Sequence, residues 1–399
     1  MNLRRRRELS DFFRDRLVND TLPFWTRHAV DREHGGFATF LDRRGDLLSP
    51  DKPMWVQGRF AWMLARLCNT LERREEWLAL ARHGIDFISR HGFDADGRVF
   101  FAVTRDGRPL RKRRYLFAEI FVILAFAEYA RASGDAGALT TARQTFELVQ
   151  RLLAAPAGSP GSLEPKVNPG TRRLRGHSMS MILVNALQVL RDADTSPNPL
   201  PYDALIDAQI DEVFRFFVKP ELKTLLETVG PEGEYLAELP EGRCVNPGHA
   251  LETAWFILAE ARRRGDAALV GRALPIIEWS LDLGWDRRHG GILYFVDVEG
   301  KQPTPCEWDM KLWWVHNEAL NATLLAHLLT GERRYERWFE RILAWSLARF
   351  PDRKFGEWFG YLHRDGSVSH DLKGNLWKGP FHLPRQQLAC HLMLAETLA

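Results

Sequence analysis

The chain has 399 residues, of which 45% are hydrophobic and 27% charged, and its 55 Lys and Arg against 52 Asp and Glu give a formal net charge of +3. This composition is typical of a soluble globular protein. A net charge so close to zero offers no general argument for nucleic-acid binding, and the basic runs at 4–7 and 111–114 are short enough to be solvated surface. We therefore expect no nucleic-acid partner.

The cysteines and the apolar segments exclude several classes of protein. Four cysteines without CxxC spacing fit no redox or zinc motif, and a chain of this length is no small disulfide scaffold, so a reducing compartment is expected. Glu8 and Asp11 interrupt the region where a secretory signal would need an apolar run. The longest apolar segment, 116–130, is too short to span a membrane and contains Glu119 and Glu128. We predict a cytoplasmic protein without a membrane partner.

A sequence repeat organises the chain. The string DREHGGF at 31–37 returns as DRRHGGI at 286–292, and each copy is followed by a segment of alternating apolar and polar residues. Similar segments that end in turn residues lie at 97–107, 223–233 and 356–366, and a degenerate Pro- and Gly-rich one lies at 155–176. Such alternation is typical of β-hairpins. The spacing predicts six units, each with one short hairpin.

Between the hairpins, apolar residues recur with the period of a helix. Phe117, Ile120, Phe121 and Leu124 are one example, at i, i+3, i+4 and i+7, and each unit has room for two such helices. The strands are too few and too distant along the chain to form a parallel sheet. We predict an all-α fold, an (α/α)6 barrel with short β-hairpins between the helix pairs, as one domain over residues 1–399.

The segments that follow the hairpins carry polar side chains among aromatic ones. They are WVQGR (55–59), RYLFAE (114–119), RGHSMSM (175–181), NPGHALE (246–252), KLWWVHNE (311–318) and KGPFHLPR (378–385). Alignment of the first and fifth units places Trp55 beside Trp314 and Arg59 beside Glu318. Equivalent positions of different units therefore face one ring, and we expect them to line a central cavity.

Two histidines in these segments are candidate catalytic residues. His249 and Glu252 stand three residues apart on one helix face, which also suits a helix-terminal ion pair. A metal site would need a second such motif, which the sequence lacks, so we expect no metal. His382 lies between Pro380 and Pro384, where a plain loop histidine is the alternative. Motifs for nucleotide hydrolysis, dinucleotide redox chemistry, zinc proteolysis and serine hydrolysis are missing, which leaves the chemistry to His, Glu and Arg.

Several of these segments, in this order and over essentially the whole chain, resemble the N-acylglucosamine 2-epimerase family, also known as renin-binding protein. The resemblance rests on EHGGF, WVQGR, TRDGRP, NPGHALE, GWDRRHGG, EWDMKLWWVHNEA, GEWFGYLHRDG and KGPFHLPR. It implies an (α/α)6 barrel that interconverts N-acetylglucosamine and N-acetylmannosamine, with relatives acting on cellobiose or on mannose and glucose. Carried over by motif, the family's functional residues fall on Arg59, His249, Glu252, Glu318 and His382.

The third unit departs from the family pattern. A histidine at this position, His177 in RGHSMSM, resembles the sugar-isomerase and cellobiose-epimerase branches. The resemblance therefore predicts the reaction type but leaves the substrate open. An aldose–ketose isomerase of mannose, glucose and fructose and a cellobiose 2-epimerase are the first alternatives. A glycoside hydrolase using two of Glu119, Glu252 and Glu318 is a further one, and a non-catalytic binding protein is another.

The favoured mechanism is proton transfer at C2 of the open-chain sugar, which requires no cofactor. His249 and His382 are expected to act as acid and base, with Arg59 stabilising the enediolate. Glu252 is expected to orient His249, and Glu318 to hold a sugar hydroxyl or to assist ring opening. The expected substrate contacts are His177, Lys311, Trp314, Trp377 and Glu119. The resemblance also implies a nucleotide such as ATP as an activator, although no motif marks its site, and we expect a homodimer.

Overall fold

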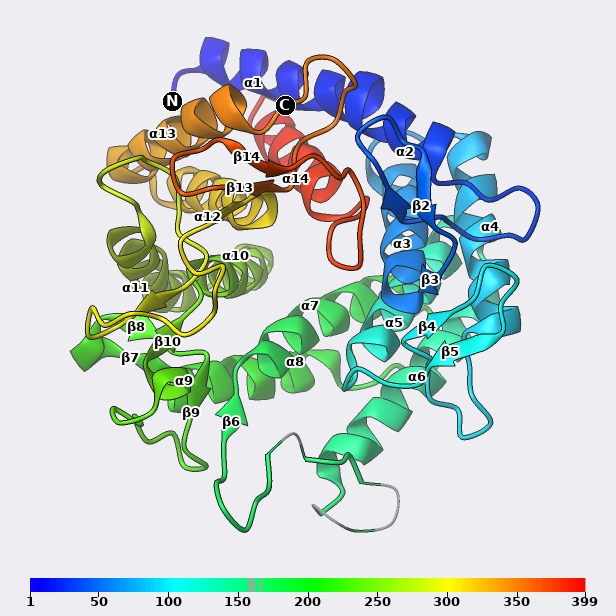
Figure 1. Cartoon of the computed structure of the whole chain (residues 1–399), viewed down its shortest axis with the longest axis horizontal. Helices are drawn as coiled ribbons and strands as arrows, with labels where there is room; N and C mark the ends of the chain where they lie inside the picture. Colours follow the sequence, from blue (N-terminus) through cyan, green and yellow to red (C-terminus); the bar gives the residue numbers. More distant parts are fainter. Residues whose placement is uncertain (157–158, 160–161, 166, 399) are drawn as a thin grey trace.

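The structure is a computed structural model that describes residues 1–156, 159, 162–165 and 167–398. Its framework is a closed ring of inner helices, in which each helix contacts the next and the last contacts the first (Figure 1). These helices are α3 (Met54–Thr70), α5 (Phe117–Ser133), α7 (Ser178–Ala193), α10 (Pro247–Arg264), α12 (Trp313–Thr330) and α14 (His382–Glu396).

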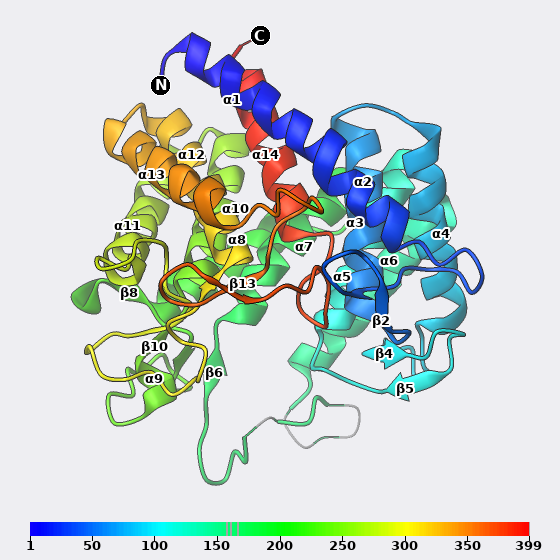
Figure 2. The same ribbon diagram turned by 45° about the horizontal axis from the view of Figure 1, so that its top comes forward.

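Each inner helix packs against one helix of an outer ring. The outer helices are α1 (Leu3–Arg16), α4 (Glu75–His91), α6 (Ala136–Ala154), α8 (Tyr202–Glu212), α11 (Ala267–Gly284) and α13 (Arg333–Arg349). Shorter helical turns are η1 (Leu17–Thr21), α2 (Leu22–His28), η2 (Val213–Phe217), η3 (Pro220–Leu222) and α9 (Pro240–Arg243). The last inner helix, α14, packs against the first outer helix, α1, so the two ends of the chain close the ring (Figure 2). The predicted (α/α)6 barrel is confirmed.

Sequence patterns separate the two rings. Nearly every residue of α5 and of α12 is buried, because each is enclosed by inner neighbours and an outer helix. The outer helices α4 and α13 instead bury one stripe and expose charged residues on the other side. The apolar segment 116–130 is therefore an inner helix, and none of the described helices has the length and apolar character to cross a membrane.

The strands are two or three residues long and gather toward one end of the helices (Figure 2). They are β1 (Phe40–Leu41), β2 (Leu47–Ser49), β3 (Lys52–Pro53), β4 (Ala102–Val103), β5 (Pro109–Arg111), β6 (Arg175–Gly176), β7 (Val218–Lys219), β8 (Thr224–Leu225), β9 (Thr228–Val229), β10 (Cys244–Val245), β11 (Val296–Asp297), β12 (Lys311–Leu312), β13 (Tyr361–Leu362) and β14 (Val368–His370). Three predicted hairpins are confirmed, since β1 pairs with β2, β4 with β5 and β13 with β14, all antiparallel.

Two other predicted hairpins are wrong, because their strands pair outside the segment. In 223–233, β8 pairs with β7 and β9 pairs with β6. After 286–292, β11 pairs with β10. The strand that precedes an inner helix offers backbone groups that need partners, and it finds them in the following unit, as in β3 with β4 and β12 with β13. The predicted unit at 155–176 lies partly outside the described residues, and its described part contains the strand β6 alone.

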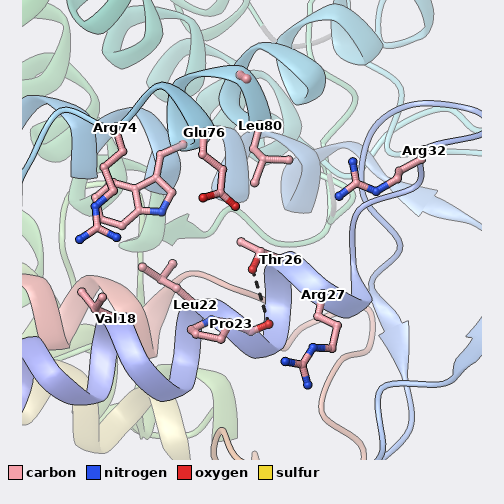
Figure 3. Close-up of a pocket in the computed structure, with 11 residues that line it drawn as sticks. Val18, Leu22, Pro23, Thr26, Arg27, Arg32, Arg74, Glu76 and Leu80 are labelled. Carbon is pink, nitrogen blue, oxygen red and sulfur yellow. Dashed lines mark hydrogen bonds between the residues drawn. The ribbon is translucent and has the colours of Figure 1, made fainter.

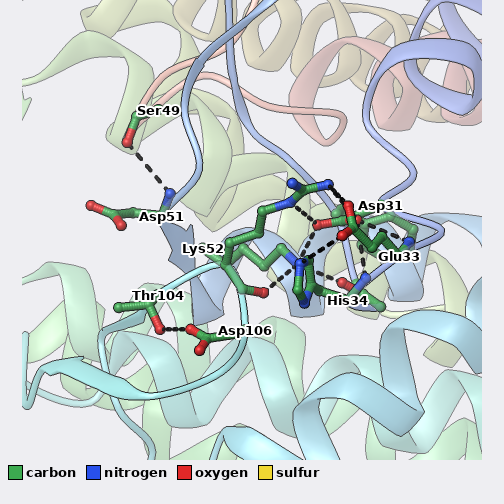
Figure 4. A network of polar contacts seen from close by, with 12 residues as sticks. Asp31, Glu33, His34, Ser49, Asp51, Lys52, Thr104 and Asp106 are labelled. Atoms are coloured by element: carbon green, nitrogen blue, oxygen red, sulfur yellow. Dashed lines mark hydrogen bonds and ion pairs between the residues drawn. The ribbon is translucent and has the colours of Figure 1, made fainter.

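The repeated loop owes its shape to a buried aspartate held by two cations. Asp31 Oδ2 accepts hydrogen bonds from Lys52 Nζ and Arg105 Nε, both at 2.9 Å (Figure 4). Lys52 Nζ also donates to the Gly35 carbonyl at 2.6 Å, which ties the glycine turn to the strand before α3. The same triad occurs three times, as Asp31–Lys52–Arg105, Asp286–Lys311–Arg364 and Asp352–Lys373–Arg43. It is a structural clamp between neighbouring units.

Candidate active site

A cavity of about 330 Å³ opens where the inner helices begin. Arg59, Ser178, His249, Trp314 and His382 line it, each from the first two turns of a different inner helix. The N-terminal turns carry unpaired backbone N–H groups and the positive ends of the helix dipoles. Their convergence favours a substrate that develops negative charge in this cavity.

The start of α10 fixes the position of His249. The Asn246 side chain caps the helix by accepting the backbone N–H of His249 at 3.2 Å, and Pro247 occupies the first helical position. A Cβ atom on Gly248 would come within 2.7 Å of the Trp314 ring, so glycine allows α10 and α12 to approach closely. The motif NPGH therefore brings His249 against the neighbouring inner helix.

Glu227, in the loop between β8 and β9, is the partner of His249. His249 Nδ1 donates to Glu227 Oε2 at 2.9 Å, which leaves Nε2 for the cavity that the ring lines. Burial alone would lower the pKa of His249, but the Glu227 carboxylate outweighs it and raises that pKa. Burial would likewise raise the pKa of Glu227, yet its pKa is held at about 2, and the largest influence that lowers it is the charge of His249. The prediction that Glu252 orients His249 is wrong, because Glu227 takes that contact.

His382 belongs to a buried cluster with two carboxylates and an arginine. His382 Nδ1 donates to Glu318 Oε1 at 2.7 Å, and Trp255 Nε1 donates to the other Glu318 oxygen at 2.7 Å. Arg385 Nη2 donates to Glu252 Oε1 at 2.5 Å and to Glu318 Oε1 at 2.6 Å. Burial, and then the charge of Arg385, hold the pKa of His382 well below its ordinary value. Glu318 therefore orients His382, and both of its oxygens are engaged by the protein.

The same cluster is where a metal ion would find ligands. Oxygen and nitrogen atoms of Glu252, Glu318 and His382 lie within 4.8 Å of one another. The Arg385 guanidinium already contacts both carboxylates and supplies the positive charge that their burial requires. A divalent cation in the same place would face that guanidinium, so these residues fit an arginine-bridged cluster better than a metal site.

Trp314 lies between the two histidines. The centre of its ring is 5.1 Å from the His249 ring and 5.5 Å from the His382 ring. The adjacent Trp313 also lines the cavity. An indole face between two imidazoles offers an apolar surface to the C–H face of a sugar ring, with a titratable group at each edge.

The guanidinium of Arg59, on α3, packs against aromatic rings. Its guanidinium carbon is 4.1 Å from the centre of the Phe121 ring and 5.0 Å from that of Phe381. No ion pair joins it to a carboxylate within the described part of the chain. Burial lowers the pKa of Arg59 to about 9, with Glu252 raising it and Arg385 lowering it further. A cation left uncompensated beside the cavity is suited to an anion formed there.

Two predicted substrate contacts are structural residues. Lys311 is fully buried in the clamp with Asp286, at 3.0 Å, and does not line the cavity. Glu119 accepts a hydrogen bond from Arg98 Nε at 2.5 Å and from the Val99 backbone N–H at 3.2 Å, which also places it outside the cavity. Both were predicted from their place in a cavity-facing segment, but their side chains point into the packing behind it.

Of the other two predicted substrate contacts, one lines the cavity and the other does not. Trp377 lines the cavity mouth, 40% exposed, with its ring 4.2 Å from the guanidinium carbon of Arg114. His177 has no exposed surface and does not line the cavity; its Nε2 is 3.0 Å from Thr253 Oγ1 and its Nδ1 is 3.7 Å from Glu227 Oε1. His177 therefore reaches the site through Glu227 and not by direct contact.

Two polar cavity residues escaped the sequence analysis. Glu227 lies in the segment KTLLETVGPEG, where it was counted only as part of a β-hairpin; a charged residue in an otherwise apolar strand was the available signal. Tyr294 follows the second GG loop and lines the cavity, with its ring 6.0 Å from that of Trp314. Burial raises the pKa of Tyr294, so its phenol is a hydrogen-bond donor at neutral pH.

A second hollow, of about 480 Å³, lies between the α1–α2 segment and α4 on the outside of the ring (Figure 3). Arg27, Arg32 and Arg74 surround it, with Glu76 as its acidic residue. Its lining has no histidine in the described residues, and the hydrogen bond drawn within it joins Thr26 to the Pro23 carbonyl. It therefore lacks the acid and base groups that distinguish the central cavity.

Comparison with known proteins identifies the family of the chain. The family model described as N-acylglucosamine 2-epimerase (GlcNAc 2-epimerase) matches residues 35–382. The N-acylglucosamine 2-epimerase of Bos taurus is 37% identical over 397 residues, covering 97% of this chain and 92% of the relative. The solved structure of a cellobiose 2-epimerase from Bacillus thermoamylovorans B4167 superposes with a TM-score of 0.82 at 20% identity, over 96% of this chain and 98% of that one. A D-mannose isomerase structure gives 0.81 at 19% identity, over 97% and 98%. The chain belongs to the N-acylglucosamine 2-epimerase family.

Proposed function

We propose that the protein is a sugar 2-epimerase that interconverts N-acetyl-D-glucosamine and N-acetyl-D-mannosamine. The observation that carries this proposal is the pair of cavity histidines, His249 and His382, which flank Trp314 and have their pKa values shifted in opposite directions. Two titratable groups whose environments separate their pKa values are suited to serve as acid and base at one pH. The substrate comes from the relatives at 34–37% identity, which are N-acylglucosamine 2-epimerases.

The proposed reaction is one proton removal and one proton return. His382 keeps its Nδ1 proton in a hydrogen bond to Glu318, so its unprotonated Nε2 is the base that takes the proton from C2 of the open-chain sugar. The C–H electrons form the C1–C2 double bond and the carbonyl electrons move to O1, giving an enolate that keeps the acetamido group on C2. Protonated His249 then donates to C2 from the other face, and the C1 carbonyl forms again. The reverse direction exchanges the two roles.

Charge stabilisation is assigned to Arg59 and to the helix ends. The enolate places negative charge on O1, and two arginines, Arg59 and Arg114, line the cavity without a carboxylate partner in the described chain. Arg59 is the one whose charge acts on His382. The N-terminal turns of the inner helices add their partial positive charge. Because the hydrogen next to a carbonyl leaves as a proton, the reaction needs no redox cofactor, and we propose that none is required.

The structure weakens the reasons for the alternatives. His177 suggested an isomerase or a cellobiose epimerase, but its side chain is buried behind the cavity. An inverting glycoside hydrolase needs two carboxyl groups about 6.5–9.5 Å apart, one of them protonated. Oxygens of Glu252 and Glu318 lie within 4.8 Å of each other, and Arg385 contacts both. Glu119 is outside the cavity.

A cytoplasmic location, a homodimer and activation by a nucleotide such as ATP stay predictions. Sedimentation velocity tests the dimer, and initial rates with and without ATP test the activation.

The proposed function is tested by incubating the purified protein with N-acetylmannosamine in deuterated water and following the products by NMR. We expect N-acetylglucosamine with deuterium at C2. Parallel incubations with mannose, fructose and cellobiose test the alternative substrates. Product that retains the C2 hydrogen, a requirement for added NAD, or faster turnover of one of the other sugars would contradict the proposal.

A further inference from the structure

The Glu227 carboxylate lies between the imidazoles of His249 and His177 but is hydrogen-bonded to His249 and not to His177. Its Oε2 accepts from His249 Nδ1 at 2.9 Å, while its Oε1 is 3.7 Å from His177 Nδ1, which is too long for a hydrogen bond. Both Oε1 and His177 Nδ1 are buried and have no hydrogen-bond partner in the described protein. These two polar atoms thus face each other without a hydrogen bond.

The hydrogen bonds of Thr253 explain why His177 Nδ1 does not donate to Glu227. Its hydroxyl donates to the His249 carbonyl at 2.8 Å, so its single proton is already used. The contact of 3.0 Å between Thr253 Oγ1 and His177 Nε2 then requires His177 to be the donor. A neutral imidazole carries one N–H, so a proton on Nε2 leaves Nδ1 bare toward Glu227.

The backbone holds this arrangement in place. The His177 N–H donates to the Glu227 carbonyl at 3.0 Å, and the Glu227 N–H donates to the Cys244 carbonyl at 3.2 Å. The β6–β9 pairing holds the segments of His177 and Glu227 together, and Thr253 lies one helical turn after His249 on α10.

We propose that His177 is a positioning residue: Thr253 fixes its proton on Nε2, and its bare Nδ1 leaves the whole charge of Glu227 to His249. This inference rests on the proposed function for its kinetic consequence. If His177 carried its proton on Nδ1, that N–H would donate to Glu227 Oε1 and draw charge away from His249. His249 would then hold its own proton less tightly.

The effect of His177 on the titration of His249 can be separated from the effects of the other charged groups around His249. Glu227 faces it from the β8–β9 loop, Glu252 from its own helix and Glu318 from α12, with the His382 ring on α14. Of these groups Glu227 is in contact with His177. A change at Thr253 or His177 therefore reaches His249 through Glu227.

The test is the Thr253→Val variant, which keeps the shape of the side chain and removes the acceptor for His177 Nε2–H. We expect the His177 proton to move to Nδ1, visible in the ¹⁵N chemical shifts of the ring. We expect the NMR titration of His249, recorded without substrate, to move to lower pH by about one unit, and the alkaline limb of kcat/KM to move with it. Thr253→Ser keeps the hydroxyl, so His249 in this variant should titrate as in the wild type.

A second variant, His177→Asn, places an amide N–H donor beside Glu227 Oε1 and should lower the His249 titration in the same direction. A wild-type His177 that carries its proton on Nδ1 would overturn the proposal, as would a folded Thr253→Val or His177→Asn protein in which His249 titrates as in the wild type. The titrations need no turnover, so they test the role of His177 even if the sugar chemistry proves different.

Discussion

Arg43 in the first hairpin holds Asp352 in the last unit. Arg43 Nε donates to Asp352 Oδ2 at 2.8 Å and its Nη2 donates to Oδ1 at 3.1 Å. In each clamp the arginine belongs to the hairpin of the next unit around the ring. The unit that follows the last one around the ring is the first unit of the chain, so Asp352 is held by an arginine of the first hairpin. This bidentate pair therefore joins the two ends of the sequence where the ring closes.

Removal of this contact should destabilise the closure. In Arg43→Met the buried Asp352 keeps Lys373 and loses a charged two-point contact, so we expect the free energy of unfolding to fall clearly below that of the wild type. Urea unfolding measures this. Arg44→Met is the matched control, since Arg44 is the adjacent arginine and is exposed. Equal losses in the two variants would contradict a special role for Arg43.

The clamps also predict a loss of stability in acid. Burial alone would raise the pKa of Asp352, but hydrogen bonds from Arg43, the Lys354 backbone and Lys373 hold it well below its ordinary value. A folded pKa below the unfolded one stabilises the protein fully above the unfolded pKa of about 3.9 and loses that contribution as pH falls toward the folded pKa. The stability gap between wild type and Asp352→Asn should therefore shrink by about 1 kcal/mol from pH 6 to pH 3. Urea unfolding at both pH values checks this, and a constant gap would refute it.

Arg59 should be required for turnover more than for folding. Arg59→Lys keeps a positive charge but loses the planar fork that can meet O1, so we expect kcat to fall by roughly 10²-fold or more. Arg66→Lys is the control, because Arg66 lies on the same helix and pairs with Glu128 away from the cavity. Steady-state rates of both variants are compared at equal thermal stability. An unchanged kcat in folded Arg59→Lys would remove Arg59 from the mechanism.

The fold and the cavity histidines could be predicted because they follow local rules. The repeat gave the six units, helical periodicity gave the helix pairs, and the segments after the hairpins brought Arg59, His249 and His382 to one cavity. These inferences need only the assumption that equivalent positions in a closed ring face the same way.

The partners of those residues could not be predicted in the same way. Glu227 meets His249 because its backbone N–H donates to the Cys244 carbonyl in β10, the strand before α10, a contact between different segments that alternation in one segment does not reveal. Lys311 has the position of a cavity residue in the sequence, but a buried aspartate, Asp286, draws it into the clamp. Charge compensation of buried groups is decided by three-dimensional contacts, which spacing alone does not fix.

The two histidines should be separable by solvent exchange. If they serve opposite faces of C2, either His249→Asn or His382→Asn abolishes epimerisation in both directions. The surviving base can still remove and return the proton on its own face. Each variant should then exchange the C2 proton of one epimer with deuterated water, and the two variants should exchange different epimers. NMR of N-acetylglucosamine and N-acetylmannosamine, followed separately, measures this.

The pH dependence of the exchange identifies the surviving base. In His249→Asn the remaining base is His382, whose lowered pKa makes it neutral at pH 7, so its exchange rate should be nearly constant between pH 6 and pH 8. In His382→Asn the remaining base is His249, whose raised pKa keeps it protonated near neutrality, so exchange should increase as pH rises. If a single surviving histidine exchanges both epimers equally, the enolate turns over in the cavity and one base serves both faces.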